Sequence, residues 1–148
     1  MNNRRQRGYI KIIIVALIVI ISGAIYYHQK KEQERAAIEA KRAAQIETLQ
    51  KLAYRWDDAL NVAASTGRLA LNGPVQELQR IRRETKDAEV PECLSVAKAN
   101  LVAGMDAFID GFLQFMQNDD AASSRKINEA KAEMSLFKLH AKDCVKPA

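Results

Sequence analysis

The sequence predicts an all-α protein in which an N-terminal transmembrane helix continues into a helical stalk and then a small antiparallel helical bundle. Three observations lead to this prediction. The run from Ile12 to Tyr27 is apolar and carries no charge. The segment from His28 to Gln50 has neither proline nor glycine and is rich in strong helix formers. From Leu49 onward, apolar residues recur every three or four positions, without the alternation typical of strands.

The net charge of +5 is concentrated at the N-terminus. Arg4, Arg5, Arg7 and Lys11 precede the apolar run with no acidic residue among them, and the rest of the chain is close to neutral. A nucleic-acid-binding domain needs a basic patch or stripe on its folded surface. No such stripe is evident here, so we expect no nucleic-acid partner.

Residues 9–27 form the predicted transmembrane signal anchor, because about 20 mostly apolar residues are needed to cross a bilayer. Tyr9 at one end and Tyr26 and Tyr27 at the other occupy positions typical of interfacial aromatic residues. The basic tail, residues 1–8, favours an N-terminus in the cytoplasm. We therefore expect a single-pass protein of the cell inner (cytoplasmic) membrane, with its C-terminal domain in the periplasm or outside the cell.

Two other interpretations of this segment remain open. Small residues at 22–24 would permit cleavage of a secretory signal peptide after Ala24, which would still export the domain. Arg7-Gly8-Tyr9 before an apolar helix resembles the processing site of the type IV pilins, which would imply a leader cleaved at this point. However, Ile13 occupies the position of that family's glutamate, and the later chain lacks the strand pattern of a pilin head.

Residues 28–50 form the predicted stalk, about 35 Å long at 1.5 Å per residue. Lys30 with Glu34 and Arg35 with Glu39 place opposite charges four residues apart, which supports a helix. The apolar residues are mostly alanine, so the segment buries little surface by itself. A weak coiled coil and a solvated single helix are both compatible with this composition.

Residues 51–148 form the predicted extracytoplasmic bundle. Ser65-Thr66-Gly67 weakens its first helix, and its helices are separated by Asn72-Gly73-Pro74, by Val90-Pro91 and by Asn118-Asp119-Asp120. Asn72 is a candidate cap, Pro74 suits a first helical turn, and the last turn also offers a cap. The predicted inward-facing positions are Leu49, Leu52, Trp56, Ala59, Ala63, Val75, Leu78, Ile81, Leu101, Met105, Phe108, Phe112, Phe115, Ile127, Ala130, Met134, Phe137 and Ala141.

The third predicted helix, which begins near Pro91, has an unusually wide apolar face. A second ridge of Val102, Ile109, Leu113 and Met116 lies beside its main stripe. A face this wide indicates contact with neighbours on two sides. The helix is therefore either central in the bundle or also part of a dimer contact.

The two cysteines are predicted to form a disulfide. Cys93 lies in the first turn of the third helix and Cys144 just past the end of the fourth, at equal distances from the Asn118-Asp119 turn. If the two helices form a hairpin, both sulfurs lie at the same end of it. A bridge fits the oxidising compartment that the anchor implies. The alternative is two unrelated small core residues.

No catalytic, metal or cofactor motif can be assembled. His28 and His140 are the only histidines, and neither belongs to a local metal motif. A haem site would have to pair His140 with one of the methionines, but no C-x-x-C-H attachment sequence is present. Asp106 and Asp110 supply too few ligands for calcium. The candidate haem partners are Met105, Met116 and Met134.

A basic run on the second predicted helix is a weak candidate for binding a phosphate or a lipid headgroup. It is interleaved with acidic residues, so a solvated helix face is the more expected interpretation. The four candidate residues are Arg80, Arg82, Arg83 and Lys86.

Taken together, these patterns predict an interaction or scaffold protein rather than an enzyme, without a cofactor. Its expected partners are the lipid bilayer and another protein or a second copy of itself, as in an accessory component of an envelope complex. The alternative is an extracytoplasmic ligand-binding or sensory domain. Four-helix extracytoplasmic sensors have a similar plan, but such a domain would have to act through a partner.

Overall fold

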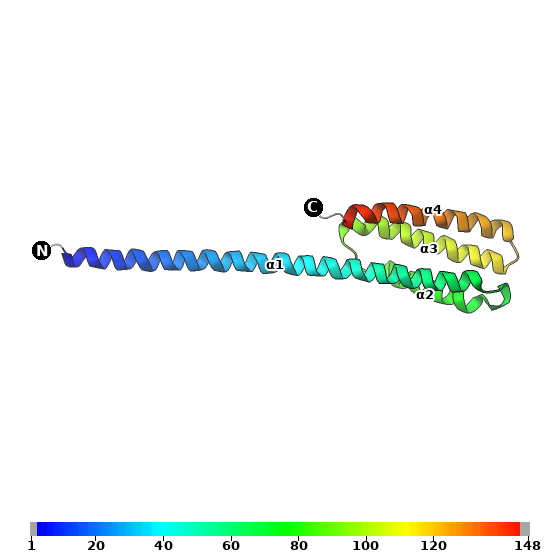
Figure 1. Cartoon of the computed structure of the whole chain (residues 1–148), viewed down its shortest axis with the longest axis horizontal. Coiled ribbons are helices and arrows are strands. Elements are labelled where there is room, and N and C mark those ends of the chain that lie inside the picture. Colours follow the sequence, from blue (N-terminus) through cyan, green and yellow to red (C-terminus); the bar gives the residue numbers. More distant parts are fainter. Residues whose placement is uncertain (1–2, 146–148) are drawn as a thin grey trace. The chain divides into compact units, whose positions relative to one another are not determined.

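The computed structural model describes the backbone of residues 3–145 and the side chains of residues 22–142 and 144, with the exception of residue 24. Residues 3–145 form helices and no strands, which confirms the predicted all-α class. The chain divides into two units, residues 1–41 and residues 42–148. The elements are α1 (Asn3–Ser65), η1 (Arg68–Ala70), α2 (Asn72–Asp87), η2 (Glu92–Leu94), α3 (Ser95–Met116) and α4 (Asp120–Val145). The α-helices among them are labelled in Figure 1.

The first unit consists of the N-terminal part of α1. Its backbone is helical from residue 3, and the side chains of residues 28–41 are all exposed. Among the side chains that the structure describes, no helix is both long enough and apolar enough to cross a membrane. Most side chains of the predicted anchor, residues 9–27, lie outside that described set.

The second unit is a helical bundle that contains the rest of the chain. It begins at Arg42 and so includes the last residues of the predicted 28–50 stalk. The physical reason is that Leu49 is buried and Ile46 packs against the core. Bundle packing therefore starts within the segment whose composition indicates a stalk.

The first bundle helix ends earlier than predicted, at the Ser65-Thr66-Gly67 segment that was expected only to weaken it, and η1 fills the residues before α2. Helix α1 ends at Ser65, and the Thr66 hydroxyl donates a hydrogen bond back to the Val62 carbonyl oxygen at 2.7 Å. The prediction that Asn72 caps the next helix is wrong. Asn72 is already the first residue of α2, and the preceding Leu71 makes no side-chain capping bond. Leu71 is fully buried. The residue at the N-cap position of α2 is therefore part of the core and has no polar side chain that could cap the helix.

The turn between α3 and α4 has the predicted cap. The Asp119 carboxylate accepts a hydrogen bond from the backbone N–H of Ala122 at 2.8 Å. Asn118 adopts the left-handed conformation with φ 64°, which asparagine tolerates better than most residues. Helix α3 begins at Ser95, slightly later than predicted, because residues 92–94 form a tight 3-10 turn after Pro91.

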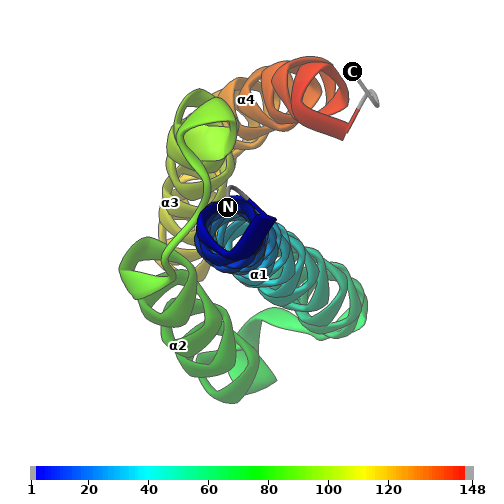
Figure 2. The same ribbon diagram turned by 90° about the vertical axis from the view of Figure 1, so that its left-hand side faces the viewer.

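Helix α3 is the centre of the bundle. It packs along α4 on one side and α2 on another, and Trp56 of α1 reaches Phe108 with 6.4 Å between ring centroids. Figure 2 shows α2, α3 and α4 in a curved row. The wide apolar face of α3 is thus used inside the bundle. The largest fully buried side chains are Trp56, Leu71, Leu78, Ile81, Leu101, Met105 and Thr85.

Two glycines allow α3 and α4 to approach closely. A Cβ atom added at Gly111 would lie 2.9 Å from Ile127 Cγ1, and one at Gly104 would lie 3.1 Å from Met134 Cε. The two glycines are seven residues apart, so they share one face of α3. Ala130 opposite them is fully buried. Small residues at this spacing therefore set the distance between the two helices.

We expect Gly111→Val to lower the free energy of unfolding by about 1–3 kcal/mol, because the added methyl groups overlap Ile127. The effect should appear in urea denaturation followed by circular dichroism. Gly73→Val is the matched control, since a Cβ at Gly73 meets nothing within 4 Å. Equal midpoints for the two variants would contradict the proposed close approach.

Candidate functional site

The structure does not bring the four basic candidates of α2 together. Arg80 pairs with Glu77 at 2.5 Å and with Glu84 at 2.6 Å on its own helix. Arg82 faces α3 and binds both carboxylate oxygens of Asp106, at 2.6 and 2.7 Å. Arg83 and Lys86 are exposed. Two of the four guanidinium and ammonium groups are thus occupied by carboxylates on different sides of the helix.

These ion pairs hold helices together. Arg55 of α1 lies 2.6 Å from Glu84 of α2. The hydrogen bond from Arg55, assisted by Arg80, lowers the pKa of Glu84. The hydrogen bond that Arg82 donates to the Asp106 carboxylate raises the pKa of Arg82. The two pairs link α2 to α1 through Arg55 and Glu84 and to α3 through Arg82 and Asp106.

The two cysteines meet at one end of the bundle, as predicted. Their sulfur atoms are 1.98 Å apart and their Cα atoms 5.3 Å apart, which is the spacing of a disulfide. Cys93 lies in η2 and Cys144 in the last turn of α4, one element earlier and slightly further inside the helix than expected. Cys93 is exposed and Cys144 is buried. The pair ties the start of α3 to the end of α4.

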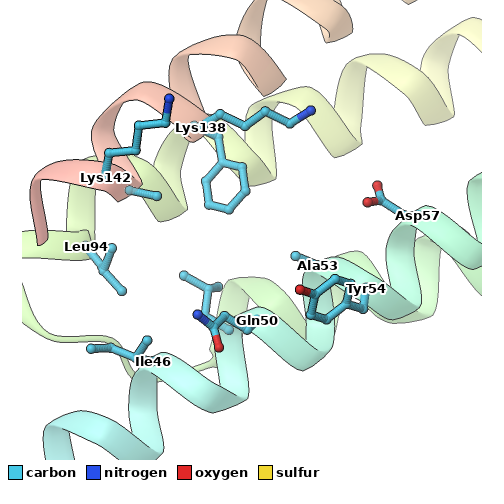
Figure 3. Close-up of a pocket in the computed structure, with 11 residues that line it drawn as sticks. Ile46, Gln50, Ala53, Tyr54, Asp57, Leu94, Lys138 and Lys142 are labelled. Atoms are coloured by element: carbon cyan, nitrogen blue, oxygen red, sulfur yellow. The ribbon is translucent and has the colours of Figure 1, made fainter. Parts of the chain in front are cut away.

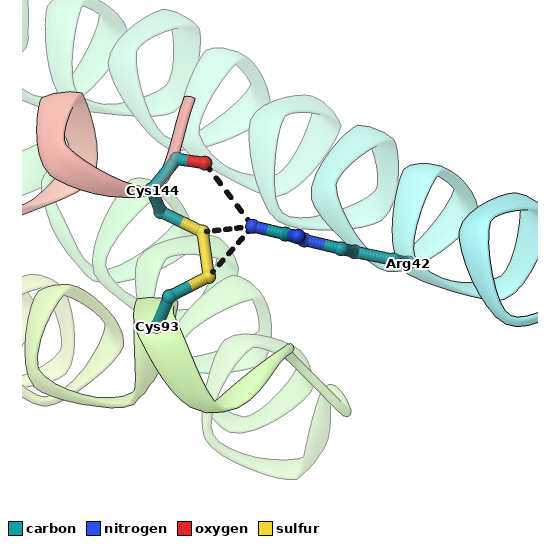
Figure 4. Close-up of a disulfide and its surroundings, with 3 residues drawn as sticks. All are labelled: Arg42, Cys93 and Cys144. Atoms are coloured by element: carbon teal, nitrogen blue, oxygen red, sulfur yellow. Dashed lines mark hydrogen bonds between the residues drawn. A yellow bond between two sulfur atoms is a disulfide. The ribbon is translucent and has the colours of Figure 1, made fainter. Parts of the chain in front are cut away.

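Arg42 of α1 covers this cysteine pair (Figure 4). Its Nη2 atom lies 3.4 Å from Cys93 Sγ, and it donates a hydrogen bond to the Cys144 carbonyl oxygen at 3.3 Å. That carbonyl belongs to the last turn of α4. Arg42 thereby caps α4 from another helix. Nothing in the local sequence around Arg42 marks this role.

The candidate metal and haem residues have the following surroundings. Within the described part of the chain, no three His, Cys, Asp or Glu side chains are placed to hold a metal ion. Asp106 is engaged by Arg82, whereas Asp110 is exposed. Met105 is fully buried in the core, and His140 is half-buried on α4. These residues act as parts of helix faces.

A groove lies between α1 and α4 (Figure 3). The first part of it is a hollow of about 410 Å³ whose walls are one face of each helix and whose floor includes Leu94. Most of the surface that lines it is apolar. The lining residues are Ile46, Leu49, Gln50, Ala53, Tyr54, Asp57, Leu94, Phe137, Lys138, Ala141 and Lys142.

A second hollow of about 330 Å³ continues the groove toward the other end of the bundle. It shares Ala53, Asp57, Phe137 and Lys138 with the first, so the two are contiguous. Its floor comes from Leu101 and Phe108 of α3. We use "the α1–α4 groove" for both hollows together. The remaining residues of the second hollow are Trp56, Leu60, Lys131, Met134 and Ser135.

The groove explains why part of the predicted core is incompletely buried. Met134, Phe137 and Ala141 were expected to face inward, but each is only half-buried. They contact α3 on one side and face the groove on the other. Tyr54 across from them is 72% exposed, although its ring lines the hollow. The indole N–H of Trp56 is buried without a hydrogen-bond partner in the described part of the chain.

Positive charges outnumber negative charges among the residues that line the groove. Lys131, Lys138 and Lys142 line it from α4, and Asp57 is the acidic lining residue, from α1. Among the side chains that the structure describes, none of these three lysines has an ion-pair partner. An apolar trough with a basic edge can bind an amphipathic partner, because it offers both hydrophobic burial and unpaired charge.

The predicted apolar stripe of α1 covers only part of its wall of this groove, through Leu49 and Trp56. Ile46, Ala53 and Leu60 are seven residues apart and form a second apolar row beside the predicted stripe of Leu49, Leu52 and Trp56. This heptad row was the available signal. It was hidden because Ala53 is small and the row begins inside the segment whose composition indicates a stalk.

Comparison of the chain with models of known protein families, with curated proteins and with solved structures found no match.

Proposed function

We propose that this chain is a membrane-anchored interaction protein whose helical bundle binds another protein outside the cytoplasm, as an accessory or scaffold component of an envelope complex. The observation that carries the proposal is the α1–α4 groove. Soluble bundles normally bury the apolar faces of neighbouring helices against each other, and a continuous apolar trough on a folded surface is typical of a binding site. The groove leaves Tyr54 and Phe137 partly uncovered.

Two features support the location in this proposal. The uncharged run from Ile12 to Tyr27 has the composition of a membrane anchor, and the basic residues before it favour a cytoplasmic N-terminus. Cys93 and Cys144 stand at disulfide distance, and disulfides persist mainly in oxidising compartments. Anchor and cysteine pair are independent features that favour the same side of the membrane.

The test is site-specific photo-crosslinking of the full-length chain in its own cells. Replacing Tyr54 with a photoreactive phenylalanine analogue places the probe in the groove. The same analogue at Leu69, which is fully exposed in η1 and outside the groove, is the matched control. We expect a protein adduct from position 54 and none from position 69.

Location is measured in the same cells. We expect the chain to resist extraction of membranes with alkaline carbonate, and its two thiols to react with an alkylating reagent only after reduction. The proposal fails if the chain is found in the cytosol with free thiols. It also fails if position 54 yields no adduct with any protein, a second copy included.

A second candidate function is a ligand-binding or sensory domain that signals through a partner. The observation that favours it is the size of the two contiguous hollows, about 410 and 330 Å³, which falls in the range of small-molecule sites. A lysine-edged apolar hollow would suit an anionic amphiphile. Thermal-shift screening separates the two functions, because a specific small molecule that raises the melting temperature favours the sensor.

A further inference from the structure

We infer that the natural occupant of the α1–α4 groove is an amphipathic α-helix with an apolar stripe and an acidic flank, supplied by the partner protein. This inference rests on the proposed function and adds the chemistry of the partner to it.

The groove has the dimensions of a helix-binding site. On α1 it extends from Ile46 to Leu60, which corresponds to about 21 Å along the helix axis. On α4 it extends from Lys131 to Lys142, about 16 Å. A partner helix of about four turns would fill this length. It would lie between two helices with α3 beneath it, as in other complexes where a helix occupies an apolar groove.

The lining accepts the apolar stripe of such a helix. The apolar side chains available to it include Phe137 and Met134 on α4 and Ile46 and Ala53 on α1. Ala53 lines both hollows, so a larger side chain at this position would block the groove where the two hollows join. Residues of a partner helix at positions i, i+3, i+4 and i+7 would point into this lining.

The charge along the edge selects an acidic partner. Lys131, Lys138 and Lys142 line the α4 edge of the groove and have no carboxylate partner among the described side chains, whereas Asp57 is the acidic group in the lining. Figure 3 shows Lys138 and Lys142 on the α4 side of the hollow and Asp57 on α1. Glutamate or aspartate on the flank that faces α4 would pair with the lysines.

A second copy of this chain fits the groove less well. Two copies that met through this face would place one hollow opposite another, and two concave surfaces leave a void rather than a packed contact. A small anionic amphiphile would satisfy the lysines, but the groove is open along its length and would leave much of such a molecule in water. A helix is convex and long enough to fill it.

The test measures binding of two synthetic peptides to the full-length chain in detergent micelles by fluorescence anisotropy. Both peptides have about 18 residues and leucine at helical i, i+3, i+4 and i+7 spacing. They differ in their flank, which carries glutamates in one and lysines in the other. We expect saturable binding of the acidic peptide, at least about tenfold tighter than the basic one, and weakening as salt increases.

Charge reversal on the groove provides the decisive comparison. Lys138→Glu with Lys142→Glu should reverse the preference, so that the basic peptide binds more tightly than the acidic one. Arg83→Glu with Lys86→Glu is the matched control, because these residues are exposed on α2 and do not line the groove. The control should leave the preference unchanged. Circular dichroism verifies that each variant keeps its helices.

A steric variant tests the same site without changing charge. Ala53→Trp fills the middle of the groove and should abolish binding of the acidic peptide, whereas Ala64→Trp, at an exposed position of α1, should not. The inference is overturned if neither peptide binds saturably, or if the charge-reversed variant shows the same preference as the parent chain.

Two further results would replace the inferred occupant. A doubled mass in light scattering that Ala53→Trp abolishes would identify a second copy instead. Saturable binding of oleate without binding of either peptide would identify an anionic amphiphile. Either result would overturn the inferred helical partner. Neither would overturn the proposed function, which is tested by membrane extraction, by alkylation of the thiols and by the crosslink at position 54.

Discussion

Replacing Cys93 and Cys144 together with alanine is expected to lower the free energy of unfolding by up to about 4 kcal/mol. The two residues are 51 apart in sequence, and their bond removes the entropy of a loop of that length from the unfolded chain. The loop contains all of α3 and nearly all of α4, so the loss should affect the whole hairpin. Urea denaturation of the variant and of the parent chain measures the difference.

Reduction of the parent chain is the matched control for this prediction. The reductant should shift the parent's midpoint toward that of the double variant and leave the variant's own midpoint unchanged. A parent chain that is insensitive to reductant and as stable as the variant would show that the cysteines are not bonded in the isolated protein.

Leu78→Ala is expected to lower the free energy of unfolding by about 2–5 kcal/mol, because Leu78 on α2 is completely buried in the core. The cost combines lost burial of the removed carbons with the cavity that remains. Leu69→Ala makes the same chemical change at a fully exposed position and should shift the free energy by less than about 0.5 kcal/mol. Thermal or urea denaturation of both variants measures the pair.

Two outcomes of the leucine substitutions would contradict the prediction. If Leu69→Ala were as costly as Leu78→Ala, then η1 would be packed against a surface that the bundle does not supply, such as a second copy. If neither substitution had an effect, α2 would not be part of the cooperative core.

Much of the fold follows from local sequence because helix faces are periodic. Trp56, Leu78 and Leu101 belong to stripes that repeat every three or four residues, and all three are buried. The meeting of Cys93 with Cys144 follows from the same kind of reasoning, since two helices joined by a short turn place equidistant residues opposite each other. These features depend on distances along the chain.

Other features depend on how the helices are placed, and the sequence does not predict them. Arg42 reaches a cysteine pair that lies far away in sequence, and Arg82 finds Asp106 on another helix. The basic run on α2 looks uniform in sequence, but its members have different surroundings because a helix turns successive residues to different sides. Partners of charged side chains are set by neighbouring helices.

The sequence alone determined the all-helical class, the order and approximate ends of the helices, their buried faces and the pairing of the cysteines, because each is a matter of local preference and spacing along one chain. Only the tertiary structure decided that α3 is central and that α1 and α4 leave a groove between them. The physical reason is that apolar stripes specify which faces are buried, whereas the distance between α1 and α4 depends on how both pack against α3. Phe137 is an example. Its place in the apolar stripe of α4 predicts that its side chain is buried, but the side chain is only half-buried because it lines the groove between α1 and α4.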